Sequence, residues 1–183
     1  PREFLPAAEP LLDLRRGQGL SVKAVAIEDV YSEFGFGEAR PEAIRDFLSY
    51  AFHHWKTPPR YVVLLGDSTY DPKDYLGTHV KDRIPSPLLE TSFLWTASDP
   101  SLAAVNGEDL VPDLAIGRLS AGSYAEAVRL IGKLVAFEEA GRTLEGKAVL
   151  VADNADLAGN FEADQDQLAQ HVLGAREVEK IYL

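Results

Sequence analysis

The 183-residue chain contains no cysteine and no methionine, and it has only four histidines. Without cysteine, it can form no disulfide, no thiolate metal site and no cysteine nucleophile of its own. Because the chain opens at Pro1 and lacks methionine, we expect it to be a piece excised from a longer translation product. The absence of cysteine leaves its cellular compartment open.

Basic residues are also scarce, since 18 Lys and Arg stand against 29 Asp and Glu, a net charge of −11. This balance argues against nucleic-acid binding, which needs clustered cations against the phosphates. No apolar run approaches the ~18 residues of a membrane-spanning helix, so we expect no span. The hydrophobic content of 46% is ordinary for a packed globular protein. The length suits one sizeable α/β domain, or one and a fraction.

The chain is organised around the stretch RYVVLLGDSTYD, residues 60–71. Its five apolar residues, 61–65, run directly into Gly66 and Asp67. A short apolar run bounded by a turn signal predicts a strand buried on both faces, as in a parallel sheet. Open α/β sheets place functional groups just past the carboxyl ends of such strands. We therefore expect any chemistry to follow Gly66.

Apolar spacing predicts further elements on both sides of this strand. Helical periodicity predicts helices at 4–12, 41–55, 124–138 and 161–172, and short apolar runs predict strands at 21–27, 113–116, 147–152 and 178–183. Residues 28–40 are expected to form a connection, and residues 141–146 a linker. The first helix has a predicted strand after it and none before it, which indicates a strand missing upstream of Pro1. The pattern predicts an α/β fold with a three-layer, parallel, Rossmann-like or flavodoxin-like sheet and helices on both faces.

Residues 66–111 form a long segment rich in Pro, Asp, Ser and Gly. A loop of this length in a compact domain is usually functional or is held by a ligand or ion. Asp67, Asp71, Asp74 and Asp99 could supply the oxygen ligands that Ca²⁺ prefers. The alternative is that these aspartates cap turns through hydrogen bonds to the backbone. The spacing is not that of an EF-hand.

The remaining polar residues offer few candidates for catalysis or binding. His79 is the one histidine within the long loop, and a solvated surface role is the simpler interpretation. No serine lies in a G-x-S-x-G turn, and Gly66-Asp67-Ser68 lacks the lysine of a phosphate-binding loop. Arg118 is expected either to form a salt bridge with Asp67 or Asp99 or to bind a carboxylate. By themselves, the residues predict an acidic loop on an α/β domain and no catalytic set.

Several stretches in order, among them YVVLLGD, TASD, PDLAIGRL with the helix after it, KAVLVADNAD and VEKIYL, resemble the gingipain-type cysteine peptidases. The resemblance implies a first α/β subdomain over residues 1–141. It also implies that residues 142–183 are the start of a caspase-like catalytic subdomain, truncated after one βαβ. In that family the catalytic histidine lies in a Gly-His-Gly turn, with the cysteine at the end of the next strand, both downstream of the VEKIYL-like strand. This chain has neither, so we expect it to be inert alone.

The resemblance also implies site residues and partners. Asp99 matches an aspartate that binds a structural calcium in similar enzymes, with Asp67 and Asp71 in a similar acidic loop. Asp164 falls near a position that helps form the substrate side-chain pocket of Arg-specific members. The implied partners are the remainder of the catalytic subdomain and, for the parent, a peptide or protein substrate, and the implied location is secreted or on the cell surface. The alternative is a non-enzymatic α/β scaffold or binding module of a surface or secretion protein on the same fold.

Overall fold

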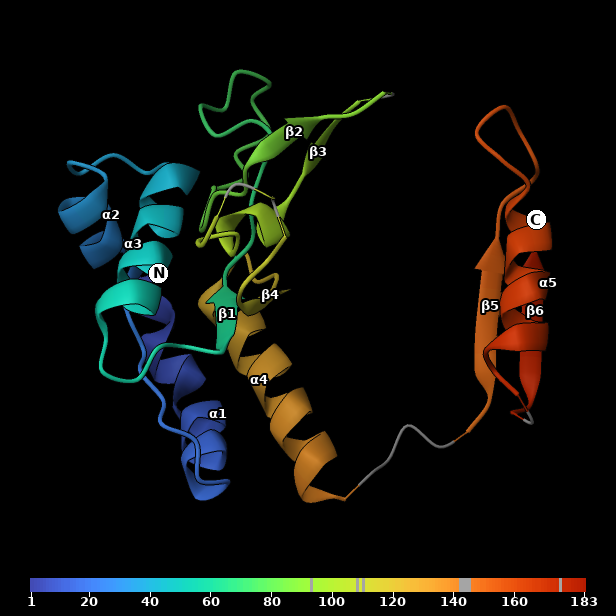
Figure 1. Cartoon of the computed structure of the whole chain (residues 1–183), viewed down its shortest axis with the longest axis horizontal. Coiled ribbons are helices and arrows are strands. Elements are labelled where there is room, and N and C mark those ends of the chain that lie inside the picture. Colours follow the sequence, from blue (N-terminus) through green and yellow to red (C-terminus); the bar gives the residue numbers. More distant parts are fainter. Residues whose placement is uncertain (93, 108, 110, 142–145, 175) are drawn as a thin grey trace. The chain divides into compact units, whose positions relative to one another are not determined.

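The structure is a computed structural model that describes residues 1–92, 94–107, 109, 111–141, 146–174 and 176–183. It forms two compact units, residues 1–138 and 139–183, which are described separately. The predicted linker falls largely on residues 142–145, which lie outside the described residues. The elements of the first part of the chain, shown in Figure 1, are η1 (Arg2–Phe4), α1 (Leu5–Gly17), α2 (Ile27–Phe34), α3 (Pro41–His54), β1 (Tyr61–Leu65), β2 (Leu88–Glu90), β3 (Trp95–Ala97), η2 (Asp99–Leu102), β4 (Ala115–Leu119) and α4 (Tyr124–Glu139).

The first unit is built on the parallel pair of β1 and β4, aligned from Tyr61 opposite Ala115 to Leu65 opposite Leu119. Backbone hydrogen bonds continue the pairing beyond the strands, from the Gly66 N–H to the Leu119 carbonyl and from the Asp67 N–H to the Ala121 carbonyl, both 3.0 Å. The short strands β2 and β3 form an antiparallel pair within the long loop. The predicted α/β class is confirmed.

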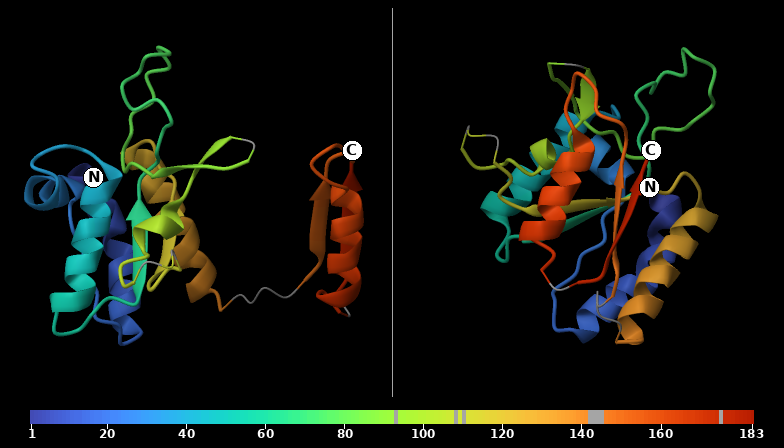
Figure 2. Two further views of the ribbon diagram at one scale, coloured as in Figure 1. Left: turned by 45° about the horizontal axis from the view of Figure 1, so that its top comes forward. Right: turned by 90° about the vertical axis from the view of Figure 1, so that its right-hand side faces the viewer.

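Helices pack on both faces of the β1–β4 pair. Val62 and Leu64 belong to one apolar cluster with residues of α2 and α3, including Val30, Ile44 and Leu48. Leu65 packs on the opposite side, against a second cluster from η1, α1 and α4: Phe4, Ala7 and Ala127. Figure 2 shows α1 and α4 side by side, joined near their carboxyl ends by hydrogen bonds of 2.6 Å from both terminal nitrogens of Arg15 to the Glu138 carboxylate.

The prediction that β1 is buried on both faces is wrong. Leu64 is 6% exposed, whereas Tyr61 and Val63 on the other face are 64% and 57% exposed. The helical cluster on that face reaches β1 only at Leu65, at the carboxyl end of the strand. The apolar run therefore predicted the strand correctly, but only one face of the strand is buried among the described residues.

The predicted strand at 21–27 is also wrong, as is the plain connection at 28–40. Residues 21–26 form no strand, and Ile27 begins α2, which extends to Phe34. A strand requires a hydrogen-bonded neighbour, and the described residues provide none for 21–26. The helix was detectable, because Ile27, Val30, Tyr31 and Phe34 follow the i, i+3, i+4, i+7 spacing of an amphipathic helix.

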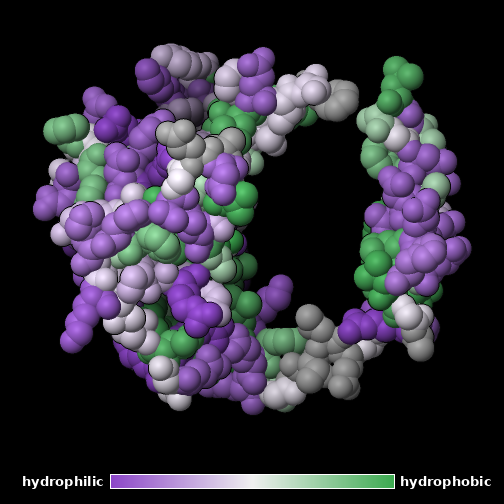
Figure 3. Space-filling model, in the orientation of Figure 1, coloured by the Kyte–Doolittle hydropathy of each residue, from purple (hydrophilic) through white to green (hydrophobic). Residues whose placement is uncertain are grey.

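The second unit is one βαβ of β5 (Ala148–Ala152), α5 (Phe161–His171) and β6 (Val178–Tyr182). Its two strands are parallel, with Ala148 opposite Val178. One face is covered, with Leu150 and Ala152 only 7% and 5% exposed. The opposite face leaves three apolar side chains open: Val149, Val151 and Ile181 are 51%, 61% and 46% exposed. Figure 3 shows hydrophobic surface along the β5 side of this unit. None of the described helices has the length and hydrophobicity that a bilayer crossing requires.

Candidate functional site

The long loop leaves β1 and returns to it at a closely packed backbone crossing. The Asp67 carbonyl accepts hydrogen bonds of 3.0 Å from the N–H groups of both Arg83 and Ile84. Gly66, with φ +157°, precedes this crossing, and a Cβ there would lie 3.0 Å from Ile84 Cγ1 and 3.1 Å from Arg83 Cβ. Glycine is therefore required by space as well as by backbone conformation. The crossing closes residues 68–82 into a loop with joined ends.

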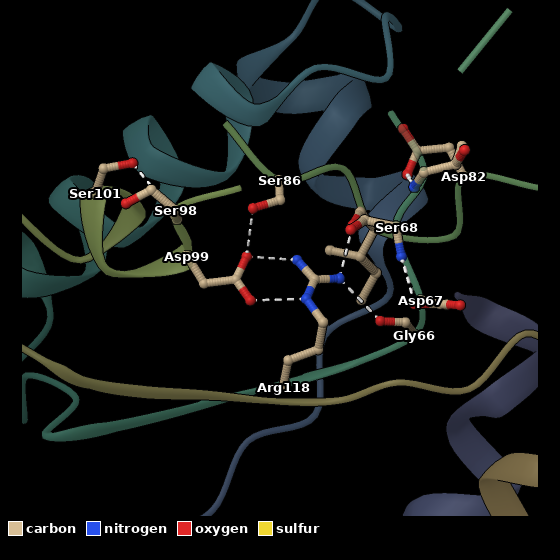
Figure 4. A network of polar contacts seen from close by, with 11 residues as sticks. Gly66, Asp67, Ser68, Asp82, Ser86, Ser98, Asp99, Ser101 and Arg118 are labelled. Carbon is tan, nitrogen blue, oxygen red and sulfur yellow. Dashed lines mark hydrogen bonds and ion pairs between the residues drawn. The ribbon is translucent and has the colours of Figure 1, made fainter. Parts of the chain in front are cut away.

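Arg118 holds the next part of the loop against the sheet (Figure 4). It lies within β4, opposite Leu64, rather than after the strand as predicted. Its Nε and Nη2 atoms donate to the two carboxylate oxygens of Asp99, both at 2.7 Å. Its Nη1 donates to the carbonyls of Gly66 and Ile84 at 2.8 and 2.7 Å. One guanidinium thus joins β4, the end of β1 and the start of η2.

The Arg118–Asp99 pair is largely shielded from water, with side chains 11% and 20% exposed. Ser86 donates a further hydrogen bond of 2.8 Å to Asp99. The hydrogen bonds from Arg118, assisted by that from Ser86, lower the pKa of the Asp99 carboxyl below its ordinary value. The predicted salt bridge of Arg118 is present, and its partner is Asp99 rather than Asp67.

Asp67 and Asp82 lie beside this network. Asp67 accepts a hydrogen bond from the Ser68 N–H at 3.0 Å. Burial raises the pKa of the Asp82 carboxyl, although the Thr69 N–H and the Arg118 charge oppose the shift. Burial, with the charge of Asp82, also raises the pKa of Tyr31, whose hydroxyl is buried and lacks a hydrogen-bond partner among the described residues.

The other acidic residues of the loop organise turns. Asp71, 7% exposed, accepts hydrogen bonds from the N–H groups of Tyr75 and Leu76 at 2.9 and 2.7 Å. Asp74, with φ +53°, accepts from both the N–H and the imidazole of His79, at 2.9 and 2.7 Å. The alternative interpretation of these aspartates, as turn formers, therefore describes their contacts.

In the second unit, Asp164 is exposed in the first turn of α5. The neighbouring Asp166 makes the contacts to the sheet: it accepts 2.7 Å from Lys180 Nζ and 2.6 Å from the Tyr182 hydroxyl. The hydrogen bonds from Lys180 and Tyr182 lower the pKa of Asp166. Burial, followed by the hydrogen bond to Asp166, raises the pKa of Tyr182 to about 12. Asp164 and Asp166 both lie within α5, so their positions in the sequence do not show which one contacts the sheet. The contacts with Lys180 and Tyr182 of β6 show that it is Asp166.

The structure therefore brings Asp99 and the backbone at Gly66 together through Arg118 and leaves Asp71 in a separate turn. Sequence reasoning missed Ser86 and Asp82, which no local motif marks. Among the residues that the structure describes, no group of three or more His, Asp or Glu is arranged to hold a metal ion. The chemistry of this site is that of a shielded ion pair that fixes a long loop.

Comparisons with known proteins relate both the sequence and the fold of this chain to one family. The sequence profile of peptidase family C25 matches residues 1–183. Among solved structures, the chain is similar to one in the complex of Porphyromonas gingivalis RgpB pro- and mature domains, with 20% identity, a TM-score of 0.67, and coverage of 100% of this chain and 40% of that one. It is also similar to the Arg-specific cysteine proteinase gingipain R (RgpB), with 20% identity, a TM-score of 0.63, and coverage of 100% and 39%. The chain thus spans about two fifths of the length of both. No curated protein matches it.

Proposed function

Since the chain belongs to peptidase family C25, we propose that it is the non-catalytic amino-terminal part of a gingipain-like cysteine endopeptidase. Residues 1–141 would form the supporting α/β subdomain, and residues 142–183 would begin the caspase-like catalytic subdomain. The 183 residues contain no cysteine. The thiolate that attacks the peptide bond would therefore lie outside these residues, and the resemblance to gingipain-type peptidases implies that it lies downstream, together with the histidine that shuttles its proton.

The observation that carries this proposal is the bare face of the β5–β6 sheet. An isolated two-stranded sheet is marginal in water. Here Val149, Val151 and Ile181 are about half exposed on one face, while α5 covers the other. A layered α/β fold buries such a face under further elements. This supports a catalytic subdomain whose remaining strands and helices are supplied by the same polypeptide.

The substrate side of the proposal concerns Asp164. An exposed carboxylate in the first turn of α5 is available to pair with a basic side chain. We propose that it contributes to the pocket for the residue before the scissile bond, favouring arginine or lysine. In the complete enzyme, Asp164→Asn should raise KM for Arg peptides more than kcat changes, with Asp153→Asn as a matched exposed control. An equal effect of both variants would remove Asp164 from the pocket.

The calcium prediction for Asp67, Asp71 and Asp99 stays a prediction. Both oxygens of Asp99 already accept hydrogen bonds from Arg118, so an ion there would have to share these oxygens with the guanidinium or displace it. Calorimetric titration with Ca²⁺ tests it: a saturable heat that disappears in Asp99→Ala is expected. Absence of that heat in the wild-type chain would contradict it.

The decisive experiment for the function begins with the parent reading frame. A Gly-His-Gly turn and a following cysteine at a strand end are expected beyond Leu183. The longer protein should hydrolyse a fluorogenic Arg or Lys peptide, the same protein with that cysteine changed to alanine should not, and neither should residues 1–183 alone. If the longer frame lacks the pair, the non-enzymatic scaffold of a surface or secretion protein is favoured instead. The family also leads us to propose a secreted or cell-surface location.

A further inference from the structure

The hairpin of β2 and β3 leaves its large apolar side chains open to water. Leu88 and Leu89 of β2 are 41% and 43% exposed, and Trp95 of β3 is 62% exposed. Leu88 and Trp95 lie on one face of the two-stranded ribbon and Leu89 on the other, so the described residues bury neither face. A free-standing two-stranded hairpin is marginal in water. Exposed apolar surface of this kind marks an interaction site.

The hairpin is nevertheless well formed and firmly attached. At its base, the Ser98 N–H donates 2.9 Å to the Pro87 carbonyl, and Ser98 directly precedes Asp99 of the shielded ion pair. At its far end, the Thr91 N–H donates 3.0 Å to the Leu94 carbonyl. Figures 1 and 2 show the hairpin projecting from the rest of the first unit. A partner that binds this ribbon therefore does not have to order it first.

Both outer edges of the hairpin carry main-chain groups that can accept a further strand. Counted from the bonds at the base and the far end, Leu89 is the residue of β2 that pairs its main-chain groups with β3. The N–H and C=O groups of Leu88 and Glu90 therefore point to the outer edge of β2. Those of Trp95 and Ala97 point to the outer edge of β3. Neither edge has another strand in the described part of the chain.

Charge distinguishes the two edges. The Glu90 side chain is exposed and makes no ion pair or hydrogen bond among the described residues, whereas the edge of β3 carries only Trp95 and Ala97. A strand added to β2 brings one side chain directly opposite Glu90, where a cation is favoured and an anion is disfavoured. A second copy of this chain, with its net charge of −11 and its own Glu90, would set like charges against each other. The edge of β2 therefore fits a basic strand of another polypeptide.

From these contacts we propose that the outer edge of β2 binds an extended polypeptide segment in which basic and apolar residues alternate. The segment adds a third strand and bonds to the main-chain groups of Leu88 and Glu90. Its basic side chains lie on the face of Glu90, with their aliphatic stems over Leu88, and its apolar side chains lie on the face of Leu89. The inference concerns binding by the first unit and does not depend on peptidase activity. In the proposed peptidase, a basic stretch of an unfolded substrate has this chemistry.

Amide exchange followed by NMR tests the inference on the 183-residue chain. The probe is a peptide of four Val-Lys repeats, and its matched control is a peptide of four Val-Glu repeats. At saturation, the Val-Lys peptide should slow exchange of the Leu88 and Glu90 amides at least about tenfold and leave those of Trp95 and Ala97 unchanged. The Val-Glu peptide should bind at least about fivefold more weakly. Glu90→Lys should reverse this order of affinity and, because residue 90 is exposed, should keep the Tm.

Four outcomes decide it. Slower exchange at Leu88 and Glu90, with a charge preference that Glu90→Lys reverses, supports the inference. Slowing at Trp95 and Ala97 instead, or no slowing with either peptide, would overturn it. A dimer in sedimentation experiments without peptide, with the Leu88 and Glu90 amides protected, would assign the edge to a second copy and also contradict it. Slow exchange of these two amides in the protein of the longer reading frame, before any peptide is added, would show that the edge is already covered and refute the inference.

Discussion

The Arg118–Asp99 pair should be the most sensitive ion pair in the first unit. Arg118 makes four short hydrogen bonds from a side chain that is 11% exposed. Removing one partner of a buried pair costs about 3–5 kcal/mol, because the other charge is left without compensation. Asp99 is 20% exposed and keeps Ser86, so its carboxylate is partly solvated after the loss. We therefore expect Arg118→Met to lower the free energy of unfolding by about 3 kcal/mol.

A double-mutant cycle isolates the pair. Asp99→Leu alone should cost about 2 kcal/mol, since Arg118 still has two carbonyl partners. The double variant should cost about 3 kcal/mol rather than 5, giving a coupling of about 2 kcal/mol. Urea unfolding followed by tryptophan fluorescence measures these values for the first unit, which contains both tryptophans. Additivity within ~0.5 kcal/mol would refute the reasoning.

The pair also predicts a pH dependence. The pKa of Asp99 is lowered in the folded state from an ordinary 3.8, chiefly by Arg118. A carboxyl with a lowered pKa adds stability above its unfolded pKa and loses it as pH falls through the folded value. The stability difference between wild type and Asp99→Leu should therefore be constant near neutrality and shrink below pH 3.8. As a control, Asp13→Asn, which breaks the exposed pair with Arg16, should leave this pH dependence unchanged, because solvent screens a surface ion pair.

Three further predictions follow from other contacts. Gly66→Ala should lower the unfolding free energy by about 1–3 kcal/mol in urea titrations, because its Cβ meets the returning loop. Asp71→Asn leaves one acceptor oxygen for the N–H groups of Tyr75 and Leu76, so trypsin should cleave after Lys73 about tenfold faster, corresponding to ~1.4 kcal/mol of local opening. Glu138 should titrate in NMR with a pKa of about 2 because Arg15 hydrogen-bonds its carboxylate, and Arg15→Gln should move that pKa up toward its ordinary value.

A control substitution and two contradicting outcomes test these predictions. Gly17→Ala meets no atom within 4 Å and lies in a helix, so it should be neutral or slightly stabilising. Equal losses at Gly17 and Gly66 would contradict the steric argument. Unchanged cleavage in the Asp71 variant would show that the turn stands without its carboxylate, and an unshifted Glu138 in wild type would contradict the bidentate geometry.

Local apolar periodicity was sufficient to predict most of the helices and the strands β1, β5 and β6, because burial of one face imposes the pattern within the element itself. It failed at residues 21–26, where strand formation depends on a neighbour, and at Tyr61 and Val63, where burial depends on what lies across the sheet. It also missed α2, although the helical spacing is present, because residues 28–40 were expected to form a connection.

In the candidate site, too, some residues could be predicted from the sequence and others could not. Arg118 and Asp99 were identified as a pair among alternatives, since an arginine beside a strand end favours a carboxylate partner. Ser86 and Asp82 were not, because their positions follow from a loop crossing that no spacing encodes. The distinction between Asp164 and Asp166 likewise needed the strand partners Lys180 and Tyr182.

The way the loop is tied suggests where this scaffold tolerates change. Its two ends meet through main-chain groups of Asp67, Arg83 and Ile84, so the junction is independent of the side chains between them. Lengthening a loop closed in this way costs only about 0.6 kcal/mol for each doubling. Residues 72–80 are thus a natural graft point, where a foreign epitope or reporter peptide can be inserted while the sheet below keeps its register.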